Sequence, residues 1–356
     1  MTDVSLEQAT YPPQAEIVRE QRAAATQSRI VVGLFIAYLL IGALLSYFRG
    51  GTFLTPDRIG VLLLAGAIVV GQGKAFVRDW GPFLLLFFGY ELMRGVADNM
   101  TDLGEYTAGD HGQILVQSLI DADKWLFFGH LPTIWLQDRL YTPGVTHWYD
   151  TGAALIYLLH FVLPLAFGFA LWLRDRSMFR RFTLMLLAMS YGAFVFFLLV
   201  PAAPPWLAAE WGYIDGVGRP SGQAYKSFLP DQWQNYDTFK LWTKASPNPV
   251  AALPSLHAAF PWLVLLVAIS TFRWWGLLLV PYNLGLWFAV VYLSQHWVVD
   301  IIGGILWATA IWALFMWVFV WRHRSRLVPV IRPSPRPVSE LNAGYPSPDG
   351  DVRPIP

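Results

Sequence analysis

The chain has 356 residues, of which 55% are hydrophobic and 14% are charged, and its formal net charge is +1. This composition excludes an ordinary soluble globular domain, in which about 25% of the residues are charged. It favours an all-α polytopic membrane protein, and the small net charge gives no reason to expect a nucleic-acid partner. Because the sequence contains no cysteine, disulfides, thiol chemistry and cysteine-based metal sites are excluded.

Polar residues fill positions 1–27, which lack the apolar core and cleavage site of a signal peptide, so the first apolar span is expected to act as a signal anchor. Eight apolar segments follow as candidates to cross a hydrocarbon core about 30 Å thick. The predicted spans are Ile30–Phe48, Ile59–Val77, Pro82–Val96, Thr151–Leu173, Phe182–Val200, Ser255–Thr271, Trp275–Leu293 and Val298–Trp321. The second is weakened by Gly71, Gly73 and Lys74, and the sixth and seventh are short, so six or seven spans remain alternatives.

The Lys and Arg residues of the short loops predict which side of the membrane each loop faces. With eight spans most of them fall on one side, which we expect to be cytoplasmic together with both termini. They are Arg19, Arg22, Arg29, Lys74, Arg78, Arg174, Arg176, Arg180, Arg181, Arg273, Arg322, Arg324 and Arg326. The opposite side receives the acidic segment Asp98–Asp150 and the loop Pro201–Pro254. Within the former, Gln113–Leu140 has a helical apolar pattern, which predicts a structural helix in the membrane interface or a wall of a lipid entrance.

Two histidines stand in short motifs at the predicted ends of apolar spans, in Pro254–His257 and in Ser294–Asp300. The helical hairpin that starts at His257 returns the chain to the same face, where His296 begins the last span. His296 and Asp300 have the spacing i, i+4, so on a helix their side chains face the same way. Such a carboxylate fixes which imidazole nitrogen is protonated and leaves the other free to attack. Ionisable residues at membrane depth are costly, so this group indicates a functional site.

The remaining histidines carry less information. A single histidine near a helix end is more often an interfacial residue than a catalyst, and this interpretation applies to His111, His130, His147 and His323. His160, midway along the fourth span, is open to either interpretation. The two motif histidines and Asp300 could also hold zinc or iron as a set of two His and one carboxylate. Catalysis by histidine needs no metal, and we expect neither a metal nor a cofactor.

The two histidine motifs resemble the second and third signatures of the type-2 phosphatidic acid phosphatase superfamily. The resemblance rests on Pro254–His257 and on His296–Gly304. A wider pattern is similar to the branch that contains the inositol phosphorylceramide synthases; it consists of Arg78-Asp79-Trp80, Pro82, Tyr90-Glu91, Arg94-Gly95 and Pro204-Pro205-Trp206. The resemblance covers roughly residues 74–321 and implies a six-helix catalytic core made of the last six spans.

This resemblance completes the predicted division of the chain. Residues 1–27 form a polar cytoplasmic N-terminus, and residues 28–77 form two extra transmembrane helices. Residues 78–321 form the six-helix catalytic membrane domain, with the interfacial segment 113–140 and the extracytoplasmic loop 201–254. Residues 322–356 are rich in proline and are predicted to be a disordered cytoplasmic tail.

The resemblance also implies roles for the motif residues. His296 would be the nucleophile that forms a phosphohistidine, Asp300 its orienting partner, and His257 the general acid that protonates the leaving oxygen. Ser255 would help to bind the substrate phosphate. A covalent intermediate of this kind lets a second substrate replace the first in the same site.

The chain departs from the superfamily pattern at two places that normally supply cations. Gly212 stands at the lysine position of the first signature, ahead of Arg219-Pro220, and Ala289-Val290 stand where the third signature has Ser-Arg. Phosphoryl transfer depends on cations that neutralise the phosphate oxygens, so replacements are expected elsewhere on the same side of the membrane. The candidates are, in order, Arg94, Arg219 and Lys226.

The sequence therefore predicts a membrane phosphotransferase that moves a phosphoryl headgroup from a lipid donor to a lipid or glycolipid acceptor. The headgroup is phosphoinositol if the resemblance extends to the substrate. One alternative is a phosphatase that uses water as acceptor for a phospholipid or polyprenyl phosphate. Another is a proton-coupled transporter with His160, His257, His296 and Asp300 as a relay. Arginine far outnumbers lysine, which hints at a GC-rich bacterial genome and hence at a bacterial plasma membrane with the site extracytoplasmic.

Overall fold

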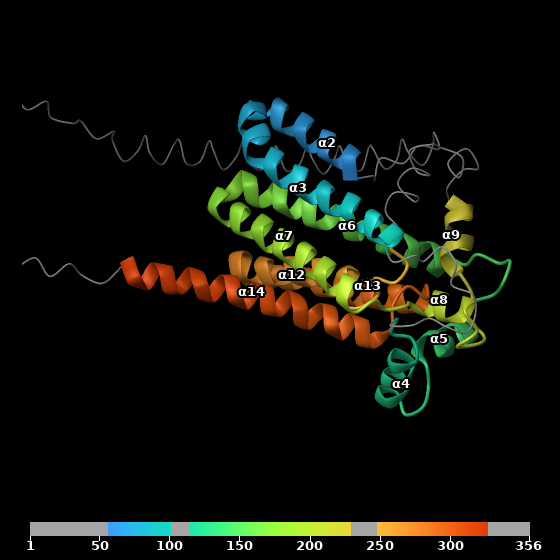
Figure 1. The fold of residues 1–356 in the computed structure, drawn as a ribbon. Helices are drawn as coiled ribbons and strands as arrows, with labels where there is room; N and C mark the ends of the chain where they lie inside the picture. Colours follow the sequence, from blue (N-terminus) through green and yellow to red (C-terminus); the bar gives the residue numbers. More distant parts are fainter. Residues whose placement is uncertain (1–55, 101–113, 229–247, 327–356) are drawn as a thin grey trace, which may run out of the picture. The chain divides into compact units, whose positions relative to one another are not determined.

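The computed structural model describes residues 56–100, 114–228 and 248–326. In these ranges the chain is helical, with isolated β-bridges in place of strands (Figure 1). The longer helices are α2 (Pro56–Val69), α3 (Gly73–Met100), α6 (Trp148–Arg174), α7 (Arg176–Leu199), α12 (Leu256–Phe272), α13 (Val280–Tyr292) and α14 (Val298–Arg326). The shorter ones are α4 (Gln117–Leu126), α5 (Pro132–Leu140), α8 (Pro205–Glu210), α9 (Pro220–Phe228) and the 3-10 helix η2 (Arg273–Leu279).

Several helical segments have the length and apolar composition that a membrane requires. Four of them in the described ranges qualify: Trp148–Arg174, Arg176–Leu199, Leu256–Tyr292 and Val298–Val318. With the further apolar helices they make the chain an all-α protein that crosses the membrane several times. The predicted first span, Ile30–Phe48, lies outside the described residues, so the count of eight stays a prediction.

The segment Leu256–Tyr292 contains a reversal and is a hairpin of two helices. α12 ends at Phe272, η2 packs back against its last turn, and α13 returns along it. Gly276 makes this close return possible, because a Cβ at that position would lie 2.5 Å from the backbone nitrogen of Ile269. The predicted sixth and seventh spans are the two arms of this hairpin.

The predicted second span is wrong in its extent. α2 ends at Val69, and the chain turns through Gly71, whose φ is 72°, before α3 begins at Gly73. Lys74 and Val77, which the prediction placed at the end of the second span, belong to the first turns of α3. The physical reason is the glycine pair, since glycine adopts a positive φ without steric cost and so ends a helix.

α6 packs against α2, α7, α12 and α13, and α3 packs against α2 and α7. Where α3 and α7 begin and α6 ends, these three helices are joined by polar contacts. The Asp79 carboxylate accepts a hydrogen bond from Trp172 Nε1 (3.0 Å) and pairs with Arg176 (2.7 Å). Arg78 pairs with the same carboxylate (2.8 Å). These residues therefore lie at the end of the helices away from the histidine motifs.

At the other end, the predicted interfacial segment forms two short helices, α4 and α5, rather than one. The chain breaks between them at Phe128 (φ 54°) and Gly129 (φ 92°). α4 packs its apolar face into a cluster with α8 and Trp297, close to the start of α14 (Figure 1). The loops that carry both histidine motifs meet at this end.

Candidate active site

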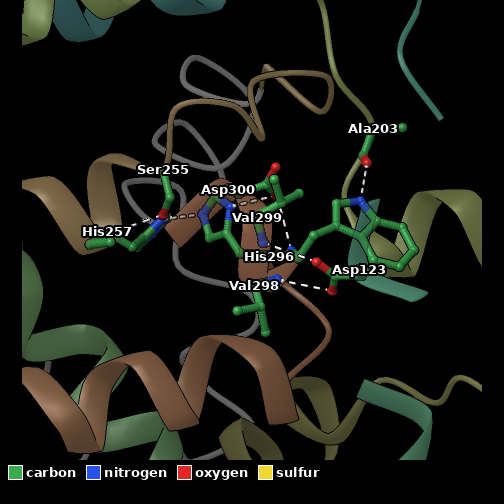
Figure 2. A network of polar contacts seen from close by, with 10 residues as sticks. Asp123, Ala203, Ser255, His257, His296, Val298, Val299 and Asp300 are labelled. Carbon is green, nitrogen blue, oxygen red and sulfur yellow. Dashed lines mark hydrogen bonds and ion pairs between the residues drawn. The ribbon is translucent and has the colours of Figure 1, made fainter. Parts of the chain in front are cut away.

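His257 and His296 lie side by side although they are far apart in the sequence. His257 stands in the first turn of α12, and His296 stands in the loop between α13 and α14. The distance from His257 Nδ1 to His296 Nε2 is 2.8 Å, which is a hydrogen bond (Figure 2). The hairpin of α12 and α13 therefore brings the two imidazoles to one face, as the helical geometry predicts.

Asp300 stands one helical turn beyond His296, on the first turn of α14. Its Oδ2 lies 3.4 Å from His296 Nδ1, an ion-pair contact at the long end of hydrogen-bond reach. The same oxygen accepts the backbone N–H of Trp297 at 3.0 Å, and the whole residue is buried. A carboxylate in this place can only accept, so it favours the proton of His296 on Nδ1 and leaves the lone pair on Nε2.

This proton arrangement decides the direction of the bond between the two histidines. Because His296 Nε2 holds a lone pair, His257 Nδ1 is the donor. The pair thus consists of a nitrogen able to attack and an N–H able to give a proton, each directed at the other. These are the two groups that a covalent phosphoryl transfer requires.

A tight backbone contact fixes α12 to α14 beside the histidines. The N–H of Ser255 donates to the carbonyl oxygen of Asp300 (3.1 Å), and Ser255 Oγ caps α12 by accepting the N–H of Ala258 (3.3 Å). The helices come so close that a Cβ at Gly304 would lie 2.2 Å from the Ser255 carbonyl oxygen. Gly303 is similarly placed, since its Cβ would lie 2.8 Å from Leu253 Cδ1.

Asp123 of α4 reaches the same helix from another direction. Its Oδ2 accepts the N–H of Val298 (3.0 Å) and its Oδ1 accepts the N–H of Val299 (2.9 Å) (Figure 2). Burial raises the pKa of Asp123 to about 6; the amides of Val299 and Val298 oppose this rise, and the charge of Asp300 adds to it. With Asp300 on the N–H of Trp297, two carboxylates occupy the first two amides of α14 and the amide just before it.

Two aromatic residues of α6 hold His257 from the side. The ring of Tyr157 stacks on His257 at 4.8 Å and 20°, and the His160 ring lies at 4.1 Å. His160 is 2% exposed, and its Nδ1 contacts the carbonyl oxygen of Tyr157. His160 thus lies beside His257, and a functional role for it stays a prediction.

The structure places the predicted phosphate-binding residues in different surroundings. Ser255 lies at the histidines, where its hydroxyl caps α12. Arg219 is 60% exposed, pairs with Glu210 (2.5 Å) and lies over the Trp206 ring. Its part in phosphate binding therefore stays a prediction. Arg94 is in α3 and Lys226 in α9, but their side chains lie outside what is described.

Sequence reasoning missed Asp123 and Tyr157. A signal for Asp123 was present, because it lies three and four residues after Ile120 and Leu119 and so shares their apolar face on α4. An aspartate on a buried face calls for a partner. Tyr157 carried no such signal, since an aromatic residue in an apolar span is ordinary. As for metals, no group of three ligand side chains suited to an ion occurs in the described ranges.

Comparison with known proteins identifies the family. The sequence pattern of the PAP2 superfamily, the type-2 phosphatidic acid phosphatases, matches residues 117–314, and the chain belongs to this superfamily. It is a multipass membrane enzyme, a phosphotransferase or phosphatase that acts on membrane lipids, and the resemblance given by its motifs is confirmed.

Among individual proteins, the chain is similar to the phosphoinositol dihydroceramide synthase of Bacteroides thetaiotaomicron. The two sequences are 31% identical over 294 residues, which cover 80% of this chain and 90% of that protein. No solved structure shows a significant match. Membership of an enzyme superfamily leaves the transporter hypothesis without support.

Proposed function

We propose that this enzyme transfers phosphoinositol from a phosphatidylinositol-type donor to a ceramide-type lipid acceptor through a phosphohistidine on His296. The observation that carries the proposal is the pairing of His296 Nε2 with His257 Nδ1 at 2.8 Å, with Asp300 behind His296. The name of the Bacteroides relative supports this headgroup and acceptor. Hydrolysis, with water as acceptor, is the alternative that the experiment below separates.

The proposed reaction has two half-reactions. In the first, His296 Nε2 attacks the donor phosphorus, a P–N bond forms, and the P–O bond to the diacylglycerol oxygen breaks. His257 gives its Nδ1 proton to that oxygen as it leaves. In the second, the acceptor hydroxyl returns a proton to His257 while its oxygen attacks phosphorus, so the P–N bond breaks and a new P–O bond forms. Asp300 stabilises the charge on His296 in both steps.

Cations for the phosphate oxygens complete the proposal. Both carboxylates at the start of α14 occupy its first amides, so the helix terminus does not offer them to a phosphate. We assign phosphate binding to Ser255 and to Arg94 first, Arg219 second and Lys226 third. For Arg219 this requires the side chain to leave Glu210, an exposed pair of small stabilising value.

The proposed site faces the outside of the cell. The short connections between α2 and α3, between α6 and α7 and after α12 lie at the end of the helices opposite to the histidines. In and beside these connections stand Lys74, Arg78, Arg174, Arg176, Arg180, Arg181 and Arg273. Basic loops face the cytoplasm, so the histidines belong to the opposite side. With a relative in a bacterium, we propose a bacterial plasma membrane, with both termini cytoplasmic.

The test is turnover of phosphatidylinositol labelled in the inositol ring, with ceramide as acceptor, by purified protein in detergent. Label on ceramide without free inositol phosphate supports transfer, and free inositol phosphate supports hydrolysis. Both outcomes must depend on His296, so His296→Ala is the inactive variant. His130→Ala, an exposed histidine in the loop between α4 and α5, is the matched control. Equal turnover by wild type and His296→Ala would reject the proposed nucleophile.

A further inference from the structure

Asp123 is a buried carboxylate outside the three motif residues. It has no exposed surface, and both of its oxygens accept N–H groups from the first turn of α14. These amides belong to Val298 and Val299, which lie between His296 and Asp300 in sequence. Asp123 thus bonds a helical turn that is 175 residues away in the sequence. This turn contains Asp300 and directly follows His296, the proposed nucleophile.

The place of α4 does not depend on this carboxylate. Leu119 and Ile120 of α4 are buried in a cluster that also contains Ala203, Leu207 and Trp297. In addition, Trp297 Nε1 donates to the carbonyl oxygen of Ala203 (2.8 Å). Apolar packing and this bond anchor the region, so a substitution at Asp123 changes the two amide bonds without removing the anchor.

We propose that Asp123 is a positioning residue for this active site: it holds the first turn of α14 so that His296 and Asp300 keep their mutual geometry. The inference rests on the proposed function for its effect on turnover, but the contact itself is independent of it. Hydrogen bonds that hold the segment next to a reactive group orient that group, and their loss typically costs about 10-fold to 100-fold in activity.

The charge state of Asp123 matters to this role. An ionised carboxylate offers acceptors to both amides, whereas a protonated one carries a donor and loses part of that capacity. The titratable group that acts on it from α14 is Asp300, His296 stands in the loop just before this helix, and on its own helix Asp121 and Lys124 are exposed to solvent. Since the pKa of Asp123 is about 6, its acceptors weaken as the pH falls through that value.

The test compares Asp123→Asn with Asp121→Asn. Both remove one carboxylate from α4, but Asp121 is exposed and accepts a hydrogen bond from Gln117 Nε2 of the same helix (2.8 Å). Asparagine keeps the shape of Asp123. Its side-chain oxygen can still accept one of the two backbone N–H groups, but its NH2 group is a donor and cannot accept the other. We expect Asp123→Asn to lower kcat about 10-fold to 100-fold with KM nearly unchanged, and Asp121→Asn to leave both unchanged.

Two further readouts separate positioning from folding. The pH profile of the wild type should lose activity below about pH 6, and Asp123→Asn should lack this component. Hydrogen exchange should accelerate at the amides of Val298 and Val299 in the variant, while α6 and α12 keep wild-type protection. A kcat within twofold of wild type, or protection lost throughout the molecule, would overturn the inference.

Failure of the proposed function has a different signature. If His296→Ala were as active as wild type, the nucleophile would be wrong, yet the exchange rates at Val298 and Val299 would still test the contact. If the exchange rates of these amides were the same in Asp123→Asn and in wild type, the positioning role would be wrong even for an active enzyme that depends on His296.

Discussion

His257 Nδ1 and His296 Nε2 lie 2.8 Å apart, and with the His296 proton on Nδ1 the hydrogen bond between them runs from His257 to His296. The proposed acid therefore covers the lone pair of the proposed nucleophile. A substrate phosphorus can approach Nε2 only when this bond breaks, and breaking it also frees the N–H of His257 to serve as the proposed acid. Attack and proton donation are thus coupled to a single rearrangement.

The division of labour between the histidines predicts opposite behaviour toward an activated donor. With a nitrophenyl phosphodiester the leaving group needs no proton, so His257→Ala should still be phosphorylated and release nitrophenol in a burst near one equivalent. With the lipid donor the same variant should lose about 10²-fold to 10⁴-fold in rate. His296→Ala should give no burst with either donor. Quenched-flow measurement of nitrophenol checks this, and a burst from His296→Ala would contradict it.

Asp300→Asn should leave the fold intact and nearly abolish turnover. Asparagine can donate to His296 Nδ1, which favours the wrong tautomer and places the proton on the attacking nitrogen. In serine proteases the equivalent change costs about 10⁴ in kcat, and we expect about 10³ to 10⁴ here. Asp138→Asn, an exposed aspartate on α5, should be neutral. Turnover by Asp300→Asn above a tenth of wild type would argue against this role.

Gly304→Ala should destabilise the protein. The new Cβ would lie 2.2 Å from the Ser255 carbonyl oxygen, so the backbone must shift, and overpacking of this kind costs about 1–3 kcal/mol. Gly152→Ala is the control, because a Cβ there meets nothing within 4 Å and alanine favours the helix. Thermal unfolding in detergent measures both. Equal melting temperatures for the two variants would show that the contact is loose.

Asp123 should make stability depend on pH in a defined direction. Its pKa is raised from 3.8 to about 6, so the folded state binds the proton more tightly than the unfolded chain. The stabilising contribution is full below the unfolded pKa and is lost as the pH rises through about 6. From about pH 5 to about pH 7.5, Tm of the wild type should therefore fall relative to Tm of Asp123→Asn. A difference that stays constant would show that Asp123 is ionised throughout.

The proposed orientation can be tested because the chain contains no cysteine. Trp125 on α4 is 81% exposed and Trp274 on η2 is 62% exposed, and they lie at opposite ends of the helices. In intact cells a membrane-impermeant thiol reagent should modify Trp125→Cys but not Trp274→Cys. After permeabilisation both should react. The reverse pattern would place the histidines in the cytoplasm.

The sequence predicts much of the architecture because membrane helices are specified by length and apolar content. The hairpin of α12 and α13 follows from such counting, and it places His257 near His296. By contrast, the early end of α2 depends on the backbone freedom of Gly71, which hydropathy does not register.

The contacts of Asp123 and His160 with the motif residues were not predictable in the same way. Asp123 and His160 reach the motif residues through tertiary contacts between segments that are distant in the sequence. Arg219 pairs with Glu210, and this carboxylate would compete with a substrate phosphate for the guanidinium group. Spacing indicates which residues share a helix face, but not which helix that face meets.

The contact of Gly304 with Ser255 has a mechanical consequence. The absence of a side chain at Gly304 lets the backbones at the starts of α12 and α14 meet, and the hydrogen bond from the Ser255 N–H to the Asp300 carbonyl oxygen joins them there. Any side chain added at this position would push apart the two segments that carry His257 and His296. The spacing of the two histidines thus depends on a residue that has no side chain.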